Sequence, residues 1–329
     1  MAEYGIPYMG SKGAIAEEIV RIFPKADNFY DVFGGGFSIT HAMLKRRSKD
    51  FQNFYFNEIK TDVVELIQKA IAGDFDYAKF TPAWVSREDF FAGLNDPYIR
   101  CFWSFGNNQR GYLFSKEIEP YKKSMHNAVV FNEFDELAEK VFHFNSFQNG
   151  YSIYQRRIFL RHKIEYYRLN GIPEFLLPFL SDEQLQQLER LQKLDRLQKL
   201  EQLEQLERMQ QLGQVEQVGK LHLSAKSYES LTIHPGSIVY CDPPYKGTGD
   251  YGNEFNTEDF LDWAHAQTEP VFISEYEIAD KRFSRIKSFE KVARFNNVIE
   301  KKTKLENIYI NQAARAKFIT ANKRLNSDE

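Results

Sequence analysis

The amino-acid sequence predicts an α/β protein whose parallel sheet is interrupted by an inserted module. Three observations support this fold class. The chain has 329 residues, 43% of them hydrophobic and 15% aromatic, which is enough to build a large folded core. Residues 1–72 alternate helical and β-type segments, a pattern typical of parallel strands. β-type runs stop after this section and return only near residue 237.

The first section reads as helix, strand, glycine loop, helix, strand and helix. The apolar spacing predicts helices wherever hydrophobic residues recur every three or four positions, and strands in the short apolar and aromatic runs. In order, these segments are 14–23, 28–33, 34–36, 38–47, 53–59 and 61–73.

Residues 73–180 are instead aromatic, polar and basic, with FWSFGNNQRGYLF (102–114) at their centre. We expect a separate, mainly helical module there. The β-type runs IVYCDPPY, PVFISEY (270–276) and ENIYIN (306–311) then resume the sheet. The predicted organisation is a discontinuous domain of residues 1–72 and 222–329, an insertion at 73–180, and a distinct segment at 181–221.

That last segment has an apolar residue at every third position. Its leucines, methionine and valines run from Leu185 to Leu221 without a slip. A period of three falls about 60° short of a full α-helical turn at each step, whereas a 3₁₀-helix would align all of these side chains on one edge. An α-helix, a 3₁₀-helix and disorder are therefore the alternatives for this segment, and we expect a structural or self-association role for it.

Composition narrows the function classes. Cys101 and Cys241 are far apart and form no CxxC or Cys/His cluster, so neither a disulfide scaffold nor a metal site is expected. The first residues lack the basic-then-apolar pattern of a signal peptide, and no apolar run is long enough to span a membrane, so we expect a cytoplasmic location. The net charge is −3, yet residues 151–170 and 281–304 are strongly basic. Each basic stretch is either a solvated helix face or part of a polyanion-binding surface.

Two features of the first section suit a nucleotide-like ligand. A strand runs directly into Gly34, Gly35 and Gly36, where backbone atoms can approach a ligand closely. Glu58 follows the next strand, at the position where such sheets bind the hydroxyl groups of a ribose. A tight turn and a surface acid are the plain alternatives.

The stretch SIVYCDPPYKGT (237–248) ends an apolar strand with an acid, two prolines and a tyrosine. The prolines fix φ and present carbonyl acceptors without N–H donors. Asp242, Pro243, Pro244 and Tyr245 thereby suit a flat ring that carries an exocyclic amino group. The ring would stack on Tyr245, and its amino hydrogens would point at Asp242 and a proline carbonyl. A capped strand terminator is the alternative.

Four motifs in this order, YMGSK (8–12), DVFGGGFS (31–38), YFNEI and VYCDPPY, resemble those of the Dam-type DNA adenine-N6 methyltransferases. The likeness covers roughly residues 5–72 and 225–312. It implies a Rossmann-like methyltransferase sheet with an inserted, mainly helical target-recognition module, beside the period-three leucine segment. It also implies S-adenosylmethionine as methyl donor, double-stranded DNA as partner, and an adenine turned out of the duplex.

The resemblance assigns site residues by position. Those implied to bind the cofactor are Tyr8, Lys12, Phe33, Gly34, Gly35, Gly36, Glu58 and Asp242. Asp242 would also contact the target. The family loop usually reads FxGxG, and here Phe37 stands at the second glycine. Either the loop shifts by one position onto Gly36 or Phe37 packs against the cofactor.

The mechanism expected from these residues is positioning. Hydrogen bonds from the adenine amino group to Asp242 and to the Pro243 carbonyl would favour a pyramidal nitrogen that can attack the methyl group. Asp242 is an unsuitable strong base, because the proton becomes acidic only after the methyl group arrives. No covalent step is expected, and Cys241 is interpreted as a small strand residue.

Base and phosphate contacts are expected from the inserted module. Arginine reads guanine, and asparagine or glutamine reads adenine, in the major groove. The candidates for base contacts are Asn107, Asn108, Gln109 and Arg110. The candidates for phosphate contacts are Lys116, Lys122, Lys123, Arg156, Arg157 and Arg161. A polar surface loop is the alternative for any one of them.

The sequence therefore predicts a site-specific DNA adenine-N6 methyltransferase of a bacterial or phage-infected cell. Cytosine-N4 or RNA-adenine transfer is the nearest alternative, and the acid in DPPY favours adenine. A catalytically silent DNA-binding or assembly protein is the alternative from another class. Residues 185–221 would serve its self-association.

Overall fold

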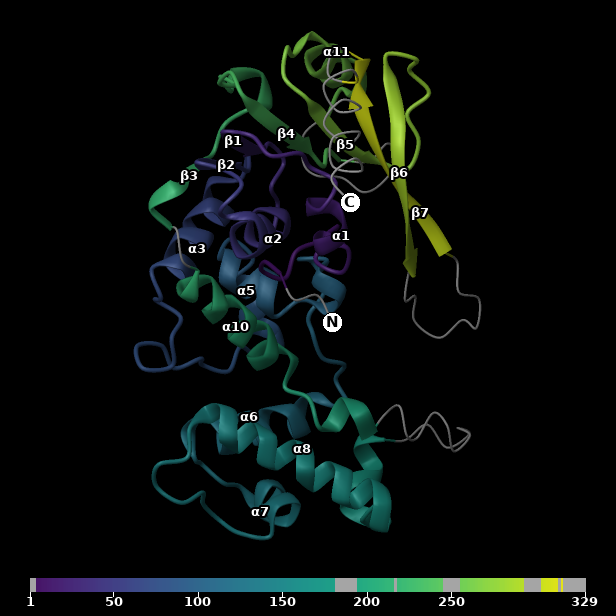
Figure 1. Ribbon diagram of the computed structural model, residues 1–329. Coiled ribbons are helices and arrows are strands. Elements are labelled where there is room, and N and C mark those ends of the chain that lie inside the picture. The colour runs from purple at the N-terminus through teal and green to yellow at the C-terminus, as the bar shows by residue number, and fades with distance from the viewer. Residues whose placement is uncertain are drawn as a thin grey trace, which may run out of the picture. The chain divides into compact units, whose positions relative to one another are not determined.

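The computed structural model describes residues 4–180, 194–215, 218–244, 255–292, 303–312 and 315 (Figure 1). The chain divides into two compact units. The first contains residues 1–6, 10–72 and 212–329, and the second contains residues 7–9 and 73–211.

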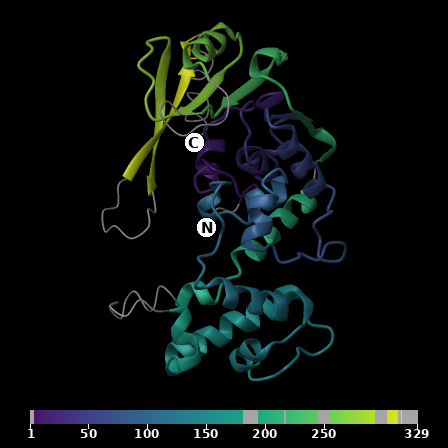
Figure 2. The ribbon, with the colours of Figure 1, turned by 180° about the vertical axis from the view of Figure 1, so that it is seen from behind.

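The first unit is built on a seven-stranded sheet in the order β3-β2-β1-β4-β5-β7-β6 (Figures 1 and 2). The first five strands in this order are parallel, while β7 is antiparallel to both β5 and β6. This confirms the predicted Rossmann-like α/β fold. The strands are β1 (Asn28–Asp31), β2 (Asn53–Asn57), β3 (Leu221–Ser224), β4 (Ser237–Cys241), β5 (Val271–Glu275), β6 (Phe283–Val292) and β7 (Thr303–Asn311).

From β1 the chain first adds β2 and β3 on one side of the sheet and then adds β4 and β5 on the other side. The direction in which strands are added therefore reverses at β1. In open parallel sheets, ligands bind outside the carboxyl ends of the strands at such a reversal. The carboxyl ends of β1 and β4 therefore mark the expected binding crevice of this unit.

Residues along the central strands alternate between two cores, as the pleat of a sheet requires. Phe29 and Phe272 pack with Phe23 on one face, with ring centroids 5.5 and 5.0 Å from it. Tyr30, Val239 and other strand residues pack on the opposite face with Phe260 of α11. The helices of this unit are α1 (Ala16–Val20), α2 (Ser38–Arg47), α3 (Thr61–Ile71) and α11 (Thr257–Ala266).

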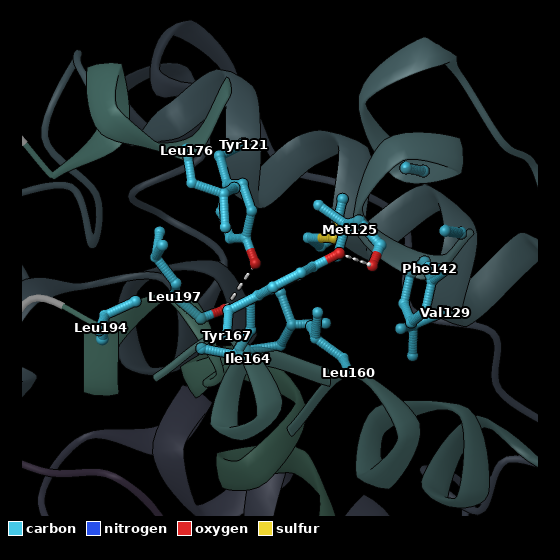
Figure 3. Close-up of a cluster of buried hydrophobic side chains, with 14 of the residues drawn as sticks. Tyr121, Met125, Val129, Phe142, Leu160, Ile164, Tyr167, Leu176, Leu194 and Leu197 are labelled. Atoms are coloured by element: carbon cyan, nitrogen blue, oxygen red, sulfur yellow. Dashed lines mark hydrogen bonds between the residues drawn. The ribbon is translucent and has the colours of Figure 1, made fainter. Parts of the chain in front are cut away.

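The second unit is mainly helical in its described residues, as expected for the inserted module. Its helices include α4 (Arg87–Ala92), α5 (Pro97–Phe102), α6 (Glu119–Phe131), α7 (Glu136–Phe142), α8 (Ile153–Asn170) and α10 (Glu201–Gln210). One core joins α6, α7 and α8 to the leucine segment. In it the Tyr121 hydroxyl donates to the Leu197 carbonyl over 3.0 Å (Figure 3).

The period-three segment forms neither a long 3₁₀-helix nor one continuous α-helix over its described residues. The chain leaves helical geometry at Leu200 (φ −109°, ψ 85°), continues as α10, and ends in short 3₁₀ turns before β3 begins at Leu221. Residues 185–193 lie outside the described part.

This segmentation explains how a period of three can be buried. Three apolar residues spaced three apart cover an arc of about 120° on an α-helix, close to the width of an ordinary apolar stripe. α10 contains three such residues, and the breaks on either side of it restart the pattern. Every period-three residue from 194 to 212 is accordingly buried: Leu194, Leu197, Leu200, Leu203, Leu206, Met209 and Leu212.

Two strands were not predicted. β3 is a four-residue edge strand at the end of the leucine pattern. β6 lies in the basic stretch 281–304, and its register shifts between Arg285 and Lys287. This β-bulge breaks the apolar alternation that would have indicated a strand. None of the described helices has the length and apolar character needed to span a membrane.

Candidate functional site

Four acidic residues stand at the carboxyl ends of neighbouring parallel strands in the first unit. Asp31 ends β1, Glu58 follows β2, Asp242 follows β4, and Glu275 ends β5. Because these strands are parallel and adjacent, their carboxyl ends meet at one edge of the sheet. We call this set of four residues the acidic edge.

Lys12 connects the acidic edge to β7. Its Nζ atom lies 2.7 Å from both Asp242 carboxylate oxygens and 3.5 Å from Oε1 of Glu306. The Lys12 side chain is 3% exposed, that of Asp242 18% and that of Glu306 0%. Burial lowers the pKa of Lys12, but the charges of Asp242 and Glu306 outweigh it, and the pKa is raised overall. The ammonium form of Lys12 is thus held among carboxylates.

Asp31 is a buried acid with a strongly perturbed pKa. Burial, reinforced by the charges of Asp242 and Glu58, raises the pKa of Asp31 to about 7, against a hydrogen bond from Thr40. That bond runs from Thr40 Oγ1 to Oδ2 over 2.7 Å. Near neutral pH, a positive charge arriving at the acidic edge would therefore favour the ionised form of Asp31.

Glu275, at the end of β5, also has a raised pKa. Burial, together with the charges of Asp242 and Glu306, raises the pKa of Glu275 to about 7, opposed by the Tyr276 backbone and Lys12. The acidic edge therefore contains two carboxyl groups whose charge can change near physiological pH.

Glu58 bridges the second strand and the glycine loop. Its two oxygens accept hydrogen bonds from the Gly35 N–H at 3.0 Å and the Lys60 N–H at 3.2 Å. Burial raises the pKa of Glu58, although these two hydrogen bonds oppose the shift. Each carboxylate oxygen has two lone pairs, so Glu58 retains acceptor capacity for further hydroxyl donors.

The glycine loop is constrained at each position for a different reason. A Cβ at Gly34 would lie 2.0 Å from the Phe56 ring. Gly35 has a φ of +49°, and the Gly36 carbonyl accepts from the Ile6 N–H at 2.8 Å. These contacts place the loop tightly against β2 and the N-terminal segment.

Phe37, which stands where the FxGxG pattern has its second glycine, has a glycine-like backbone conformation and a buried ring. Its φ of +68° is in the left-handed region that glycine favours, and its ring is fully buried. The ring lies 5.1 Å from the Phe56 ring and 6.4 Å from the His41 ring, centroid to centroid. Phe37 therefore packs in the protein core, and the expectation that it packs against the cofactor is wrong. Phe33, by contrast, is half-buried, 5.5 Å from the Tyr228 ring.

The structure describes all but one of the other residues predicted to bind the cofactor or to act in catalysis. Tyr8 is buried and belongs to the second unit, whereas Lys12 belongs to the first. Pro243 is buried and Pro244 half-buried directly after β4. Tyr245 lies outside the described residues, so its stacking role stays a prediction.

The recognition candidates lie on a preorganised loop of the second unit. An isolated antiparallel bridge joins Ser104 and Tyr112. Oδ1 of Asn108 accepts from the Arg110 and Gly111 N–H groups, both at 2.9 Å. Oε1 of Gln109 accepts from Arg100 Nε at 3.3 Å. Asn107 and Gln109 have positive φ angles, and the Arg110 side chain is exposed. Asn108 and Gln109 thus help to shape the loop that presents Arg110.

Two predicted phosphate contacts need correction. The Lys122 side chain is 1% exposed, and its ammonium binds the carbonyls of Arg196 and Lys199 and the Glu201 carboxylate. These acceptors gather where the leucine segment breaks at Leu200. Lys122 therefore stabilises an internal break and is not available to a phosphate in this structure.

Arg157 is the second correction. It is buried and pairs with Glu204 at 3.0 Å and Glu207 at 2.5 Å, linking α8 to α10. Lys116, Lys123 and Arg161 are exposed. Arg156 is half-buried, and desolvation lowers its pKa.

Three acids of this site were missed by sequence reasoning: Asp31, Glu275 and Glu306. A signal existed for the first two, since each is an acid inside a predicted strand, and each proved to be the last residue of the observed strand. Glu306 had no such signal, because it lies within a β-type run. Among the described residues, no group of three or more His, Cys, Asp and Glu side chains could hold a metal ion.

A comparison with protein families identifies a match. A family model described as D12 class N6 adenine-specific DNA methyltransferase matches residues 8–276. No curated protein matches the sequence. The matched range includes the glycine loop, the inserted module and the whole acidic edge. It ends before β6 and β7 begin.

Proposed function

The chain belongs to the D12 class of N6 adenine-specific DNA methyltransferases, and we propose that its acidic edge, centred on Asp242, is where the methyl group is transferred. The family establishes the reaction: transfer to the N6 amino group of an adenine in DNA, with the base turned out of the duplex. The observation that carries the location is the Lys12–Asp242 pair at the strand-order reversal.

The cofactor of this family is S-adenosylmethionine, which supplies the methyl group from a positively charged sulfonium and also carries an ammonium group. The residues present suit such a cation. The acidic edge, next to Lys12, contains four carboxyl groups that can face a cation: those of Asp31, Glu58, Asp242 and Glu275. We propose that Glu58 accepts the ribose hydroxyls and that Asp31 and the loop of Gly34 and Gly35 receive the methionine portion.

Asp242 and the Pro243 carbonyl then act on the adenine. Both are acceptors, so they align the amino hydrogens and leave the nitrogen lone pair directed at the methyl carbon. The Lys12 ammonium, 2.7 Å from both oxygens, favours the ionised carboxylate of Asp242. An ionised and paired carboxylate is a good hydrogen-bond acceptor and a weak base, which is the role proposed.

The electron balance needs no further reactant. When bound, S-adenosylmethionine would supply the methyl group: adenine N6 would form the new bond to the methyl carbon, and the sulfur would keep the electron pair of the broken carbon–sulfur bond. The nitrogen then carries a positive charge and releases a proton to solvent. The protein contributes orientation and electrostatic stabilisation.

Recognition of the DNA sequence is assigned to the loop between Ser104 and Tyr112. Arg110 is the proposed base-reading residue, because its exposed guanidinium can bind guanine through two hydrogen bonds. Lys116, Lys123, Arg156 and Arg161 are the proposed phosphate contacts. If Arg110 reads a base, Arg110→Ala should relax the methylated sequence at one position, as sequencing of methylated adenines would show.

A methyl-transfer assay tests the site. Wild-type protein should move tritium from labelled S-adenosylmethionine to DNA, and mass spectrometry of the nucleosides should show N6-methyladenosine in its deoxy form. Asp242→Ala should abolish transfer, whereas Asp74→Ala, at an exposed acid of the second unit, should retain it. Normal transfer by Asp242→Ala would refute the proposed site, and N4-methylcytosine as product would refute the assignment to adenine.

Several finer assignments remain proposals. The Dam-type subgroup rests on the four motifs. Self-association through residues 185–221, a cytoplasmic location in a bacterial or phage-infected cell, and a paired restriction nuclease are each consistent with this family, and none of them is needed for the reaction.

A further inference from the structure

Glu306 is a buried acid that touches the reaction site from outside the matched part of the chain. It lies on β7, beyond residue 276 where the family match ends. Its side chain is 0% exposed, and Oε1 is 3.5 Å from the Lys12 ammonium. Its neighbour Asn307 bonds instead to Ser288 and to the Tyr276 carbonyl.

A fully buried carboxylate is costly unless a positive charge accompanies it. Lys12 provides that charge, and Lys12 is itself buried against Asp242. The three residues therefore form one electrostatic unit, in which a single ammonium bridges a partly exposed carboxylate and a fully buried one. Removing Glu306 would leave Lys12 with the desolvation cost and one carboxylate fewer.

We propose that Glu306 is a positioning residue for methyl transfer: it anchors the Lys12 ammonium from the β7 side, so that Lys12 stays charged and in place when Asp242 accepts the amino hydrogens of adenine. This inference rests on the proposed role of Asp242. Glu306 touches neither the cofactor nor the adenine in this scheme. It acts through Lys12.

The electrostatic reason is competition for the Asp242 carboxylate. An amino group donating to Asp242 must share its oxygens with Lys12. With Glu306 present, the ammonium keeps a second carboxylate during this exchange. Without Glu306, Lys12 keeps one carboxylate fewer beside it, and its proton is held less firmly.

Other titratable groups face the same cluster and must be considered. Glu275 ends β5, and Tyr276 follows it; the charges of both are coupled to Lys12, Asp242 and Glu306. Tyr240 on β4 is fully buried with its hydroxyl 2.7 Å from the Ser274 hydroxyl, and burial raises its pKa well above the usual value. Asp31 is coupled to Asp242. The pKa values of Asp31 and Glu275, both raised to about 7, belong to the neutral part of the profile. The pKa of Tyr276 is raised mainly by burial and also by Glu306, so a Lys12→Met background is needed to assign the alkaline limb to Lys12.

The pH profile of single-turnover methyl transfer tests the proposal. Glu306→Gln keeps the shape of the side chain and removes its charge. Loss of one nearby opposite charge should move the alkaline limb of the rate profile toward neutrality by about one to three pH units. Glu306→Asp keeps the charge at a greater distance from Lys12, so it should shift the limb less, in the same direction. A Glu306→Gln profile that superimposes on the wild-type profile would overturn the proposal.

A double-mutant cycle separates positioning from general stability. If Glu306 acts through Lys12, then Glu306→Gln should change the transfer rate much less in a Lys12→Met background than in the wild type. Equal fold-changes in the two backgrounds would contradict this. Asn311→Ser is the matched control, because Asn311 is also fully buried on β7 but bonds to the carbonyls of Ala264, Gln267 and Glu269. It should lower the melting temperature and leave the pH profile unchanged.

Two further outcomes distinguish this inference from the proposed function. Should Glu306→Gln not fold, as judged by circular dichroism, the Glu306→Asp profile carries the test, and an unshifted limb refutes the inference. If Asp242→Ala is inactive while the Glu306 variants behave as wild type, only this inference fails. If Asp242→Ala is active, the proposed site itself fails.

Discussion

Lys12 and Asp242 are separated by 230 positions in the chain, yet the Lys12 ammonium lies 2.7 Å from both carboxylate oxygens of Asp242. The two residues precede α1 and follow β4, and the folding of the parallel sheet brings them together. Asp242 is 18% exposed and Lys12 is 3% exposed. The pair is thus open on the carboxylate side and closed on the ammonium side, as an acceptor site for an incoming amino group requires.

Lys12→Met should destabilise the protein at pH 7 by about 3–5 kcal/mol, since it leaves buried carboxylates without their counter-charge. The raised pKa of Lys12 fixes the pH dependence. Its stabilising contribution is fully present below the unfolded-state pKa, about 10.5, and is lost as pH rises through the higher folded-state pKa. Urea unfolding at pH 7 measures the effect.

Lys25→Met is the control for that measurement, because the Lys25 side chain is 78% exposed in its ion pair with Asp50. An exposed pair contributes little, so this variant should stay within about 1 kcal/mol of wild type. Equal losses for the two variants would show that the Lys12 pair is no more important to stability than a surface pair.

Asp31→Asn should stabilise the free protein at pH 8. The Asp31 pKa is raised to about 7 by burial and the nearby Asp242 and Glu58 charges, against the Thr40 hydrogen bond. The favourable contribution of protonated Asp31 is present below its unfolded-state value of 3.8 and is lost as pH rises through about 7. The variant lacks this loss, which is on the order of a few kcal/mol. Melting curves at pH 4 and pH 8 should agree at the first and differ at the second.

The same substitution should weaken binding of S-adenosylmethionine. Calorimetry should show a larger loss of affinity at pH 8, where wild-type Asp31 is ionised, than at pH 6. Asp74→Asn, an exposed acid, should change neither quantity. Unchanged cofactor affinity in Asp31→Asn at both pH values would remove Asp31 from the binding site.

Phe37→Gly should destabilise the protein less than Phe37→Ala does. Both variants lose the buried ring, which costs about 3–5 kcal/mol. Only the glycine variant removes the strain of the left-handed backbone at φ +68°, which should restore about 1 kcal/mol of stability. Urea unfolding of the two variants measures the difference. An alanine variant at least as stable as the glycine variant would show that this backbone conformation is unstrained.

Arg157 and Arg161 lie on the same helix, α8, but their substitution should affect different properties of the protein: stability for Arg157 and DNA binding for Arg161. Arg157→Met breaks the buried pairs with Glu204 and Glu207 and should cost about 3–5 kcal/mol of stability without changing the salt dependence of DNA binding. Arg161 is exposed, and Arg161→Met should leave stability within about 0.5 kcal/mol. It should also lower the slope of log affinity against log salt by about one.

Fluorescence anisotropy with duplex DNA over a potassium chloride series, beside urea unfolding, measures both properties. A reduced salt slope in folded Arg157→Met, with no change in Arg161→Met, would reverse the assignment of these two arginines.

The sequence by itself determined the features that depend on neighbouring residues. The run into Gly34, the acid after the second strand and the Asp-Pro-Pro sequence are local patterns, and their order sufficed to indicate the family and the sheet. The apolar run that forms β5 was likewise recognisable from the sequence. β6 was not predicted, because its bulge between Arg285 and Lys287 interrupts the alternation of apolar and polar residues by which a strand is recognised in a sequence.

Only the tertiary structure decided which charged residues face the site and which are buried elsewhere. Lys122 and Lys123 are adjacent in sequence, yet one binds carbonyls inside the second unit and the other is exposed. The leucine period is buried because the helix breaks at Leu200, where packing and the Lys122 ammonium compensate the broken backbone. Asp242 follows β4 at the carboxyl edge of the parallel strands, and antiparallel β7 brings Glu306 to the same edge, because the neighbouring Asn307 pairs with Glu275 at the end of β5. Lys12 reaches both carboxylates from the segment before α1, and burial there makes the three charges interdependent.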